Sequence, residues 1–453
     1  MYNTTQIEKA GKPAVALVHR DFVPDAMMAS AGKGIPGLRL VPELVPLECT
    51  IMADVEVAVD AVVDDIIAAL TKPLTAEEKA PQAPAVEAVP SVVFKGSLAE
   101  VNRFYYQRGW TDGLPVIPPT PEAVAEMLAG TDLPPDHVVA EMIPRLGKAT
   151  VEKIAVNAVM AGALPTAMPV LIAAVKALLD PRAYFGTWQV STGSWAPFWV
   201  VNGPIRPQIN LNCGVGALSP GDIANATIGR AIGLIIKNIG GVRKGIEDMG
   251  VLGNPGKYTQ VIGEKEEDSP WEPLHVEHGL KKEDSAITLF CPNCDARLMT
   301  YGSDDKGILN AIIYNLLPGR RGLTLLALNP LNAKALADKG WTKDGIRFYV
   351  SQYGRVPAFR HSAYVYGADP GVHEKELVTV NPMDSMSILH DPDWIRVVVA
   401  GGSGNIVNIF QAQTLSGSVA GPTSWVTQKI DLPPDWEKLV RKYRNVVPTY
   451  LRY

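Results

Sequence analysis

Residues 197–205 read PFWVVNGPI, and the chain continues at residues 210–229 with NLNCGVGALSPGDIANATIG. The first segment is a short apolar run that leads into a Gly/Pro turn, which is typical of a buried strand. The second segment predicts a glycine-rich turn followed by a helix that opens near Asp222 and runs to about Lys237. A buried strand followed by a turn and a helix is the building unit of an α/β fold.

The alternation of strands and helices continues on both sides of this segment. The chain before it predicts a helix with Pro121 in its first turn, a helix that begins at Thr150, and a third helix over residues 168–179. Further strands are predicted at the short apolar runs 286–290, 324–328 and 395–400. The predicted fold class is therefore α/β. The strand order cannot be derived from the pattern, and no convincing internal repeat is found.

Three parts follow one another along the chain. Residues 1–72 predict a small β-α-β-α unit, half of a doubly wound sheet, with its second strand over 38–46 and its second helix over 53–70. Residues 73–92 are rich in Pro, Ala, Glu and Lys and predict a semi-extended linker, with a strap packed on the surface as the alternative. Residues 93–453 predict a large mixed α/β module, in which we expect the active site.

Composition and charge limit the classes of function. With 453 residues, of which 47% are apolar and 20% charged, the chain can bury large cores. A net charge of −5 gives no basic field for nucleic acid. The longest apolar stretch, residues 151–179, is interrupted by Gly, Pro and charged side chains, so we expect no membrane span, and we see no signal peptide. Four cysteines, two of them in one CxxC, favour a reducing cytoplasm.

The glycine-rich segment 210–229 is the first candidate site. Its glycines allow a close backbone approach, and free N–H groups at the following helix start attract anions. Cys213 lies just before that helix, where positive potential could lower the pKa of the thiol and favour a nucleophile or reductant. The alternative is a tight turn around a buried, inert cysteine. The predicted substrate-binding residues are Asn212, Gly214, Gly216 and Asn225 in this segment, with Trp110, Lys257, Gly402 and Ser403 elsewhere.

The second candidate is a pair of motifs in the segments PLHVEHGL and LFCPNC. Two residues separate His275 from His278, and two separate Cys291 from Cys294. Two imidazoles and two thiolates can close a tetrahedral zinc site, so zinc is the possible cofactor. A redox dithiol is a second interpretation, and a third is that neither motif binds or reacts. His275 is also a candidate general acid or base, and Glu277 is a candidate catalytic carboxylate.

Two loops complete the set of candidates. Residues 109–119, GWTDGLPVIPP, form a stiff loop in which Asp112 could act as a general acid or base. An Asp in a turn more often caps neighbouring backbone N–H groups, which is the structural alternative. Residues 397–410, VVVAGGSGNIVNIF, run from a strand into Gly402 and Ser403. This arrangement favours either a ligand-binding turn at the carboxyl end of a parallel strand or a tight loop without a ligand.

Several long motifs resemble those of a group of large bacterial proteins that is associated with the UGSC family. That family is named for a motif containing selenocysteine or cysteine. The matching segments, in chain order, are RGWTDGLPVIPPT, ATVEKIAVNAVMAGALP, NATIGRA, PGKY, SPWEPLHVE and VVVAGGSG. They run through most of residues 94–430. Residues 13–70 resemble the later half of a UGSC-like domain, with DFVPDAMMASAGKGIPGLRLVPE matching the part downstream of the family's motif. Residues 1–72 are thus interpreted as a partial UGSC-like unit.

The resemblance implies thiol- or selenol-linked chemistry in a hetero-oligomer, and it assigns no catalytic residue. Because no CGSC motif occurs near the N-terminus, a UGSC-type partner subunit would supply the family's reactive sulfur. We therefore expect a subunit of a cytoplasmic enzyme that acts on a small polar or anionic molecule, by thiol-linked or metal-assisted chemistry of the redox or lyase/hydratase type. The alternative is a non-catalytic scaffold subunit. We expect the N-terminal unit to pack against the large module or against a partner chain.

Overall fold

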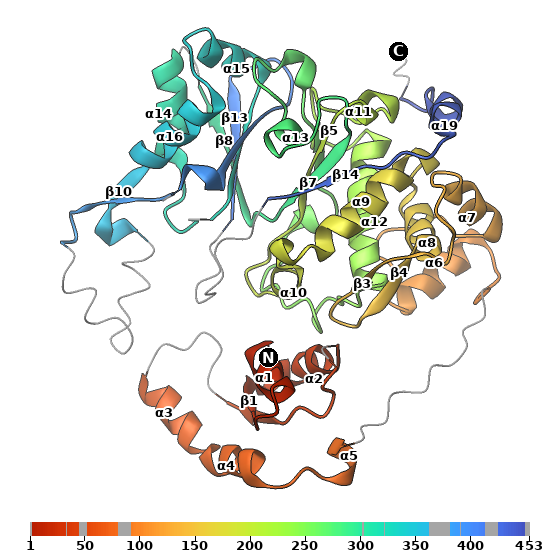
Figure 1. The fold of residues 1–453 in the computed structure, drawn as a ribbon, viewed down its shortest axis with the longest axis vertical. Coiled ribbons are helices and arrows are strands. Elements are labelled where there is room, and N and C mark those ends of the chain that lie inside the picture. Colours follow the sequence, from red (N-terminus) through yellow and green to blue (C-terminus); the bar gives the residue numbers. More distant parts are fainter. Residues whose placement is uncertain are drawn as a thin grey trace.

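Two four-stranded sheets form the centre of the large module, and helices cover their outer faces (Figure 1). The computed structural model describes residues 2–32, 34–44, 52–79, 92–300, 303–320, 322–361, 381–389, 391–412 and 425–448. Helices account for 41% of the structure and strands for 17%, so the predicted α/β fold class is confirmed. Among the helices in these ranges, none is long and apolar enough to cross a membrane.

The first sheet has the strand order β14-β7-β5-β6. Its strands are β5 (Phe198–Asn202), β6 (Val261–Gly263), β7 (Ala286–Phe290) and β14 (Val426–Lys429). β5 and β6 run parallel, whereas the other neighbours are antiparallel. Every residue of β5, β6 and β7 is buried, which is expected for strands that are covered on both faces.

The second sheet repeats this arrangement, with the strand order β12-β9-β13-β8. Its strands are β8 (Cys294–Met299), β9 (Thr324–Leu328), β12 (Ile395–Val399) and β13 (Ile406–Gln411). β12 and β9 form the parallel pair, and the remaining neighbours are antiparallel. The strands predicted at 286–290, 324–328 and 395–400 are thus β7, β9 and β12. Strand β12 ends at Val399, one residue before the predicted end.

Two consecutive parts of the chain build these sheets with the same topology. The first runs through β5, α11 (Ile205–Gln208), α12 (Ile223–Asn238), β6 and β7; the second runs through β9, α15 (Pro330–Ala337), α16 (Lys343–Tyr353), β12 and β13. Each part then adds a strand to the other sheet: β8 follows β7 but pairs with β13, and β14 follows β13 but pairs with β7. This topological repeat was not found in the sequence. Buried strands need apolar residues of suitable size rather than particular ones, so the two repeats can differ at most positions.

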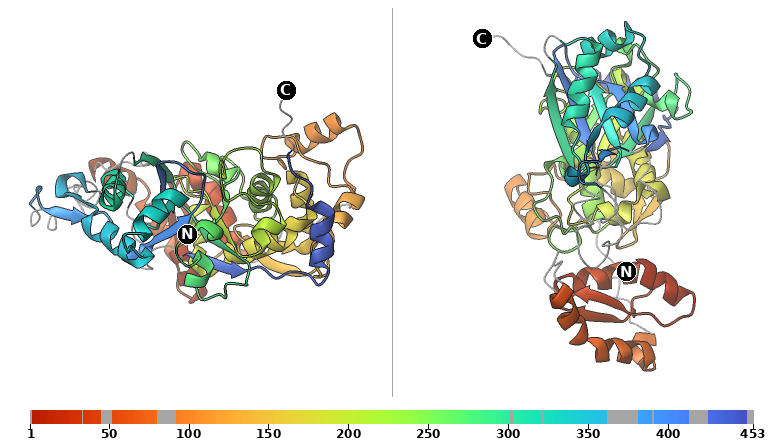
Figure 2. Two further views of the ribbon diagram at one scale, coloured as in Figure 1. Left: turned by 90° about the horizontal axis from the view of Figure 1, so that it is seen from above. Right: turned by 90° about the vertical axis from the view of Figure 1, so that its left-hand side faces the viewer.

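Successive side chains of a strand point to opposite faces, so each central strand contributes to two cores. The core between the sheets contains Phe198, Val200, Phe290, Leu325, Ala327, Val398 and Phe410. The ring centroids of Phe198 and Phe410, one from each sheet, lie 4.6 Å apart. The outer face of the first sheet packs on α9 (Met168–Leu179) and α12, and that of the second packs on α14 (Asp305–Asn315) and α16. The module is therefore a four-layer α-β-β-α sandwich (Figures 1 and 2).

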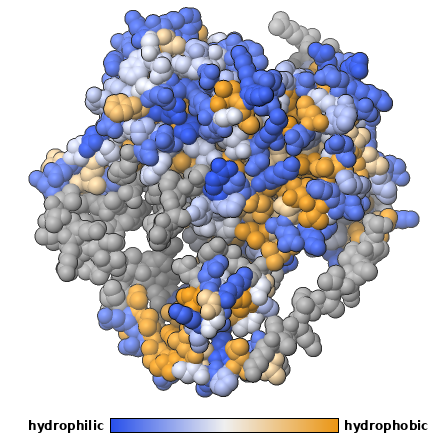
Figure 3. Space-filling model, viewed as in Figure 1, coloured by the Kyte–Doolittle hydropathy of each residue, from blue (hydrophilic) through white to orange (hydrophobic). Residues whose placement is uncertain are grey.

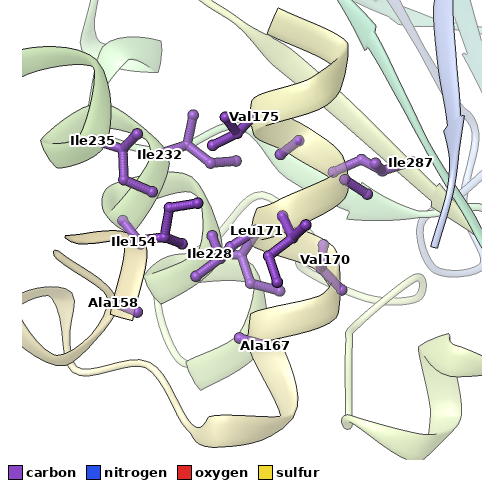
Figure 4. Close-up of a cluster of buried hydrophobic side chains, with 14 of the residues drawn as sticks. Ile154, Ala158, Ala167, Val170, Leu171, Val175, Ile228, Ile232, Ile235 and Ile287 are labelled. Atoms are coloured by element: carbon purple, nitrogen blue, oxygen red, sulfur yellow. The ribbon is translucent and has the colours of Figure 1, made fainter. Parts of the chain in front are cut away.

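The helices over the first sheet begin where their sequence predicts. The Thr150 side chain accepts a hydrogen bond from the backbone N–H of Lys153 and caps α8 (Val151–Ala161). Pro121 is the first residue of α7 (Pro121–Leu128), and α9 spans the predicted residues. Side chains of α8, α9 and α12 interlock in one cluster (Figure 4), which includes Ile154, Ala158, Leu171, Val175, Ile228 and Ile232.

The remaining elements of the large module lie around this sandwich. The helices are α6 (Leu98–Gln107), α10 (Phe185–Trp188), α13 (Leu274–Glu277) and α19 (Trp436–Tyr443). Two antiparallel pairs are formed by β3 (Val138–Met142) with β4 (Gly147–Thr150) and by β10 (Arg355–Pro357) with β11 (Ser385–Ser387). Short 3-10 turns cover 165–167, 181–183, 255–257, 266–268, 358–360 and 392–394, and a further one covers 20–22 in the N-terminal unit.

In the N-terminal unit, β1 (Ala16–His19) and β2 (Leu40–Glu43) form a two-stranded parallel sheet connected by α2 (Val23–Gly32). Helix α1 (Tyr2–Lys9) precedes them. The single helix predicted over 53–70 is instead two helices, α3 (Met52–Asp60) and α4 (Val63–Thr71). The break falls in a stretch of valines and aspartates, which have low helix propensity. Residues 45 and 46 of the predicted second strand lie outside the described residues.

This unit forms a lobe of its own (Figure 2, right) and carries many apolar side chains on its surface (Figure 3). Helix α4 buries none of its residues. The exposed large apolar residues are Ile7, Leu17, Met27, Leu44, Val57, Val63, Ile67, Leu70 and Leu74. The start of the predicted linker belongs to the unit, because Glu78 of α5 (Ala76–Lys79) forms an ion pair with Arg39 at 2.9 Å.

Candidate functional site

The two glycine-rich segments predicted as separate candidates lie together at the junction of the two topological repeats. The backbone N–H of Gly401 donates a hydrogen bond to the carbonyl oxygen of Cys213 at 2.9 Å. A side chain at Gly402 would meet Cγ2 of Val215 at 2.4 Å, so the two turns are in tight contact. Lys265, just beyond β6, donates its N–H to the carbonyl oxygen of Val399 in β12 at 2.7 Å. The junction thus lies at the carboxyl ends of β6 and β12, where ligands of α/β proteins commonly bind.

Two asparagines shape the turn that carries Cys213. The Oδ1 atom of Asn225 accepts from the N–H of Asn212 at 2.8 Å, and its Nδ2 donates back to the Asn212 carbonyl at 2.9 Å. The Asn212 side chain accepts from the N–H of Gly214 at 2.7 Å and donates to Asp222 at 2.8 Å. Gly216 has a φ of 69°, a left-handed conformation that glycine adopts without strain. Asn212 and Asn225 therefore support the turn, and their predicted role in substrate binding stays a prediction.

Cys213 is half-buried, and burial raises the pKa of its thiol above the ordinary value. The positive charges of Arg206 and Lys265 act in the opposite direction, whereas the negative charge of Glu267 adds to the increase. The expected lowering of this pKa by a helix start is thus wrong. Cys213 precedes α12 by ten residues and does not lie at its free N–H groups, so desolvation has the larger effect. The cysteine is a neutral thiol beside two cations.

Arg206 is almost completely buried, with 4% of its side chain exposed. Its guanidinium contacts Glu266 at 3.0 Å and Glu267 at 3.0 Å, and it also donates to the carbonyl oxygens of Gly203 and Glu264. These acceptors offset the cost of removing the charge from water. Sequence patterns gave no reason to select Arg206, although a lone arginine after a buried strand is a signal that could have been used.

Glu264 continues this network toward the second candidate segment. Its fully buried carboxylate accepts hydrogen bonds from Asn202 Nδ2 at 2.7 Å and from the N–H of Leu274 at 2.8 Å. Lys343 of α16 lies 3.4 Å from Glu264 and 2.8 Å from Glu277. Asn202 Nδ2 also donates to Glu266, the partner of Arg206, so a buried polar network connects Arg206, beside Cys213, with Glu277 in the HVEH motif. Glu277 is engaged in this network through its ion pair with Lys343, and its predicted catalytic role stays a prediction.

The two histidines of that motif have different surroundings. His275 is fully buried, and neither ring nitrogen has a hydrogen-bond partner in the part of the chain that the structure describes. His278 contacts the Thr427 hydroxyl through Nδ1 at 2.5 Å and the Arg396 guanidinium through Nε2 at 3.1 Å. Burial and then the charge of Arg396 lower the pKa of His278 to about 4. His278 is thus a neutral imidazole with both nitrogens engaged, and the predicted role of His275 as a general acid or base stays a prediction.

The CPNC motif is the connection through which the chain passes from the first sheet to the second. Cys291 directly follows β7 and is buried, which raises its pKa well above the ordinary value. Cys294 opens β8, donates its thiol to the Gln411 carbonyl at 3.3 Å, and also has a raised pKa because of burial. Neither cysteine has an activated thiol, and both are unpaired. The redox dithiol stays a prediction.

The zinc interpretation also stays a prediction. Within the described ranges, no three or more His, Cys, Asp or Glu side chains are arranged so that they could hold a metal ion together. Both ring nitrogens of His278 are occupied by Thr427 and Arg396. Zinc binding by His275, His278, Cys291 and Cys294 would therefore require these side chains to move.

The loop around Asp112 is tied to α12. Arg230 binds the Asp112 carboxylate through Nε at 2.7 Å, and Lys237 donates to the carbonyl oxygen of Thr111 at 2.6 Å. The Trp110 ring packs edge-on against Tyr105, with 5.4 Å between the centroids. None of these contacts reaches Cys213. The predicted catalytic and binding roles of Asp112 and Trp110 thus receive no support, and the alternative of a structural turn fits.

The last two predicted binding residues have different outcomes. Lys257 forms an ion pair with Asp248 at 2.6 Å, away from the turn at Cys213. Ser403 is exposed next to Gly402, beside that turn. Comparisons with family models, with curated proteins and with solved structures found no match for this chain. The interpretation of the site therefore rests on its own geometry.

Proposed function

We propose that this chain is a subunit of a cytoplasmic enzyme that performs thiol-linked chemistry on a small polar or anionic molecule at the junction of its two repeats. The observation that carries the proposal is the position of Cys213: a half-buried thiol beside the Arg206 guanidinium, on a turn that is held against the Gly401–Gly402 turn of the other repeat. Fixed turns that meet at the carboxyl ends of strands favour a ligand site.

The chemistry follows from the charges around the thiol. Arg206 and Lys265 are two cations near Cys213; Arg206 is paired with Glu266 and Glu267, and Lys265 is paired with Asp268. An anionic group that binds here competes with these carboxylates for the two cations and brings its electrophilic atom to the sulfur. The thiol must lose its proton before the sulfur can form a covalent bond, so the reactive form is the minority form at neutral pH. The rate of thiol-linked chemistry should therefore rise with pH.

A protection experiment tests this proposal. Native protein is alkylated with iodoacetamide in the presence of pools of small carboxylates, phosphates or neutral polyols, and peptide mapping gives the rate at each cysteine. The proposal expects an anionic pool to slow alkylation of Cys213 and leave that of Cys294 unchanged. Equal rates with all pools at both cysteines would contradict it.

The metal-assisted and redox forms of the chemistry are separated by metal analysis of the pure protein. About one zinc per chain that is lost in the Cys291→Ser variant would favour the metal-assisted form. Protein without metal, whose Cys291 and Cys294 form a disulfide with a mild oxidant, would favour the redox form.

A second candidate function is a scaffold subunit in a complex with a UGSC-type protein. The observation that favours it is the N-terminal unit, whose two-stranded parallel sheet is smaller than the sheets that are stable alone. Parallel sheets usually have both faces covered, and this unit leaves Leu17, Val57 and Ile67 exposed. Co-expression with a UGSC-type protein tests this function. A chain that stays monomeric and turns over substrate alone would contradict it.

A further inference from the structure

A partly enclosed cavity lies beside the start of α12, outside the group of charges around Cys213. Its polar lining residues are Thr166, Asn210, Asp222 and Thr227. The space between the lining residues, open solvent included, is about 410 Å³, which limits a ligand to a small molecule. The rest of the lining is apolar and consists of Leu164, Ala167, Ile209, Ile223, Ala224, Val446, Val447 and Pro448. The lining thus holds one acidic side chain and no basic one.

The segment that follows α19 forms one wall of this cavity. The Nδ2 atom of Asn210 donates a hydrogen bond to the carbonyl oxygen of Arg444 at 3.0 Å. This bond ties the end of α19 to the turn after α11, and Val446 and Val447 then line the cavity. Residues more than 200 positions apart in the sequence therefore fix its shape, as in a preformed ligand site.

Thr166 brings a buried hydroxyl to the cavity. It is the only polar residue in the segment LPTAMPVL, residues 164–171. Only 3% of the residue is exposed, and within the described part of the chain its hydroxyl makes no hydrogen bond. Removing a hydroxyl from water without giving it another partner is costly. This hydroxyl therefore favours a ligand that carries a polar group.

The start of α12 offers further donors. Asp222 is the residue that precedes the helix, but its side chain does not bind the backbone N–H groups of the first turn. Its Oδ2 atom instead accepts a hydrogen bond from Asn212 at 2.8 Å. Ile223 and Ala224 of the first turn line the cavity. Because the first N–H groups of a helix have no partner within the helix, they are available to an oxygen atom of a ligand.

The charges of these groups select a neutral hydroxyl. The positive potential at the helix start repels an ammonium group, and the Asp222 carboxylate repels an anion. A hydroxyl can accept from the helix N–H groups or from Thr166 and can donate to Asp222. Among the described residues, only one oxygen of the Asp222 carboxylate has a hydrogen bond, so the other can accept one. The anion that the sequence predicts at this helix start is thus disfavoured by the carboxylate beside it.

We propose that this cavity binds a small neutral alcohol. The hydroxyl of the alcohol lies between Thr166, Asp222 and the start of α12, and its short alkyl chain lies against the apolar lining. The site goes beyond the proposed function, because it does not use the Cys213 thiol and binds whether or not this thiol reacts.

The test titrates the full chain with propanol, propylamine and propionate at matched ionic strength. The probes have chains of equal length and differ in the charge of the polar end. Binding is followed by the NMR signals of the labelled methyl groups of Thr166 and Ile223, which Thr166→Val and Ile223→Val assign. We expect saturable shifts of both signals with propanol, and binding about tenfold or more weaker for each charged probe.

Variants of Thr166 decide whether its hydroxyl binds the ligand. Thr166→Val keeps the shape of the side chain and should weaken propanol binding, read at Ile223, by about fivefold or more. Its urea midpoint should be equal to or above that of the wild type, because the hydroxyl has no partner to lose. Thr166→Ser keeps the hydroxyl and should keep the binding. Thr187→Val is the matched control, because Thr187 is exposed and lies outside the cavity, and it should bind as the wild type does.

Asp222→Asn tests the selection by charge. The substitution removes the negative charge but keeps an acceptor for Asn212. Propionate should then bind about threefold or more tightly than it binds the wild type, because the positive potential of the helix start is no longer opposed. Unchanged propionate binding would contradict the role of the carboxylate.

Four results would overturn the proposal. They are no saturable shift with propanol up to hundreds of millimolar, a charged probe that binds as tightly as propanol, equal propanol affinity in Thr166→Val and the wild type, and a Thr166→Val chain that does not fold. Cys213→Ser must bind propanol like the wild type. A loss of binding in Cys213→Ser would place the alcohol at the thiol instead, which would overturn this site and leave the proposed function standing.

Discussion

The backbone N–H of Gly401 donates a hydrogen bond to the carbonyl oxygen of Cys213 at 2.9 Å. The two residues are 188 positions apart and belong to different topological repeats, so this bond, together with the one from Lys265 to Val399, joins the two parts of the chain at their candidate site. Because Cys213 is bonded to Gly401 and Lys265 is bonded to Val399, the position of the Cys213 thiol and of its neighbouring cation depends on both repeats. Disturbing the contact between the turns should change the reactivity of Cys213.

Gly402→Ala tests that contact. The added methyl group would meet Val215 at 2.4 Å, and Val215 is exposed, so its side chain can give way. We expect a loss of about 1–2 kcal/mol in the free energy of unfolding and faster hydrogen exchange of the Gly401 amide. Gly404→Ala is the control, because nothing lies within 4 Å of its added methyl group. Equal exchange rates at Gly401 in both variants would contradict the tight contact.

Lys343→Met tests the buried network. Only 5% of the Lys343 side chain is exposed, and its loss leaves the carboxylates of Glu264 and Glu277 without their cation. We expect a loss of about 3–5 kcal/mol in the free energy of unfolding, measured by urea denaturation. The added Glu264→Gln substitution should restore part of it. Lys334→Met removes an ion pair whose lysine is 70% exposed, and it should cost less than about 1 kcal/mol. Similar losses in both lysine variants would show that the network is not buried.

His278 predicts a pH dependence of stability. Its pKa is about 4 in the folded chain, below the ordinary value of 6.5, so between these values the unfolded chain binds a proton that the folded chain does not. Stability from this group is therefore complete above pH 6.5 and is lost as the pH falls toward 4, by about 3 kcal/mol. In His278→Gln this component should vanish. The difference in unfolding free energy between wild type and variant is measured at several pH values, and a constant difference would argue against a buried neutral histidine.

Asp112→Asn distinguishes a structural role from a catalytic one. The ion pair with Arg230 is 18% exposed on both sides and ties the loop to α12. We expect a loss of about 1–3 kcal/mol in the free energy of unfolding, with no change in the alkylation rate of Cys213. Arg230→Gln should give a similar loss. A changed rate at Cys213 with unchanged stability would restore Asp112 as a site residue.

Local elements could be predicted from the sequence, but their assembly could not. Helix α9 and strands β7 and β9 lie at their predicted residues because capping residues and apolar runs act locally. The pairing of β14 with β7 could not be predicted, since Val426 lies opposite Leu289 and no local signal connects them. An exchange of strands between two repeats is therefore invisible in a single sequence.

In the candidate site, too, some residues could be predicted from the sequence and others could not. The glycine turns were found because glycine marks close backbone approach, and both lie at the site. Arg206 and Lys343 were missed because their importance comes from burial and from partners distant in sequence, such as Glu264 with Lys343. The pKa of Cys213 was predicted in the wrong direction because desolvation depends on tertiary packing.

The most direct measurement compares an anionic with a neutral alkylating reagent at Cys213. Rates with iodoacetate and iodoacetamide are determined by peptide mapping in the native and the unfolded chain. If Arg206 and Lys265 form an anion-attracting thiol site, the ratio of the iodoacetate rate to the iodoacetamide rate at Cys213 will be higher in the native chain, and it will fall with added salt and in Lys265→Gln but not in Lys334→Gln. A native ratio equal to or below that of the unfolded chain would contradict the proposed thiol site.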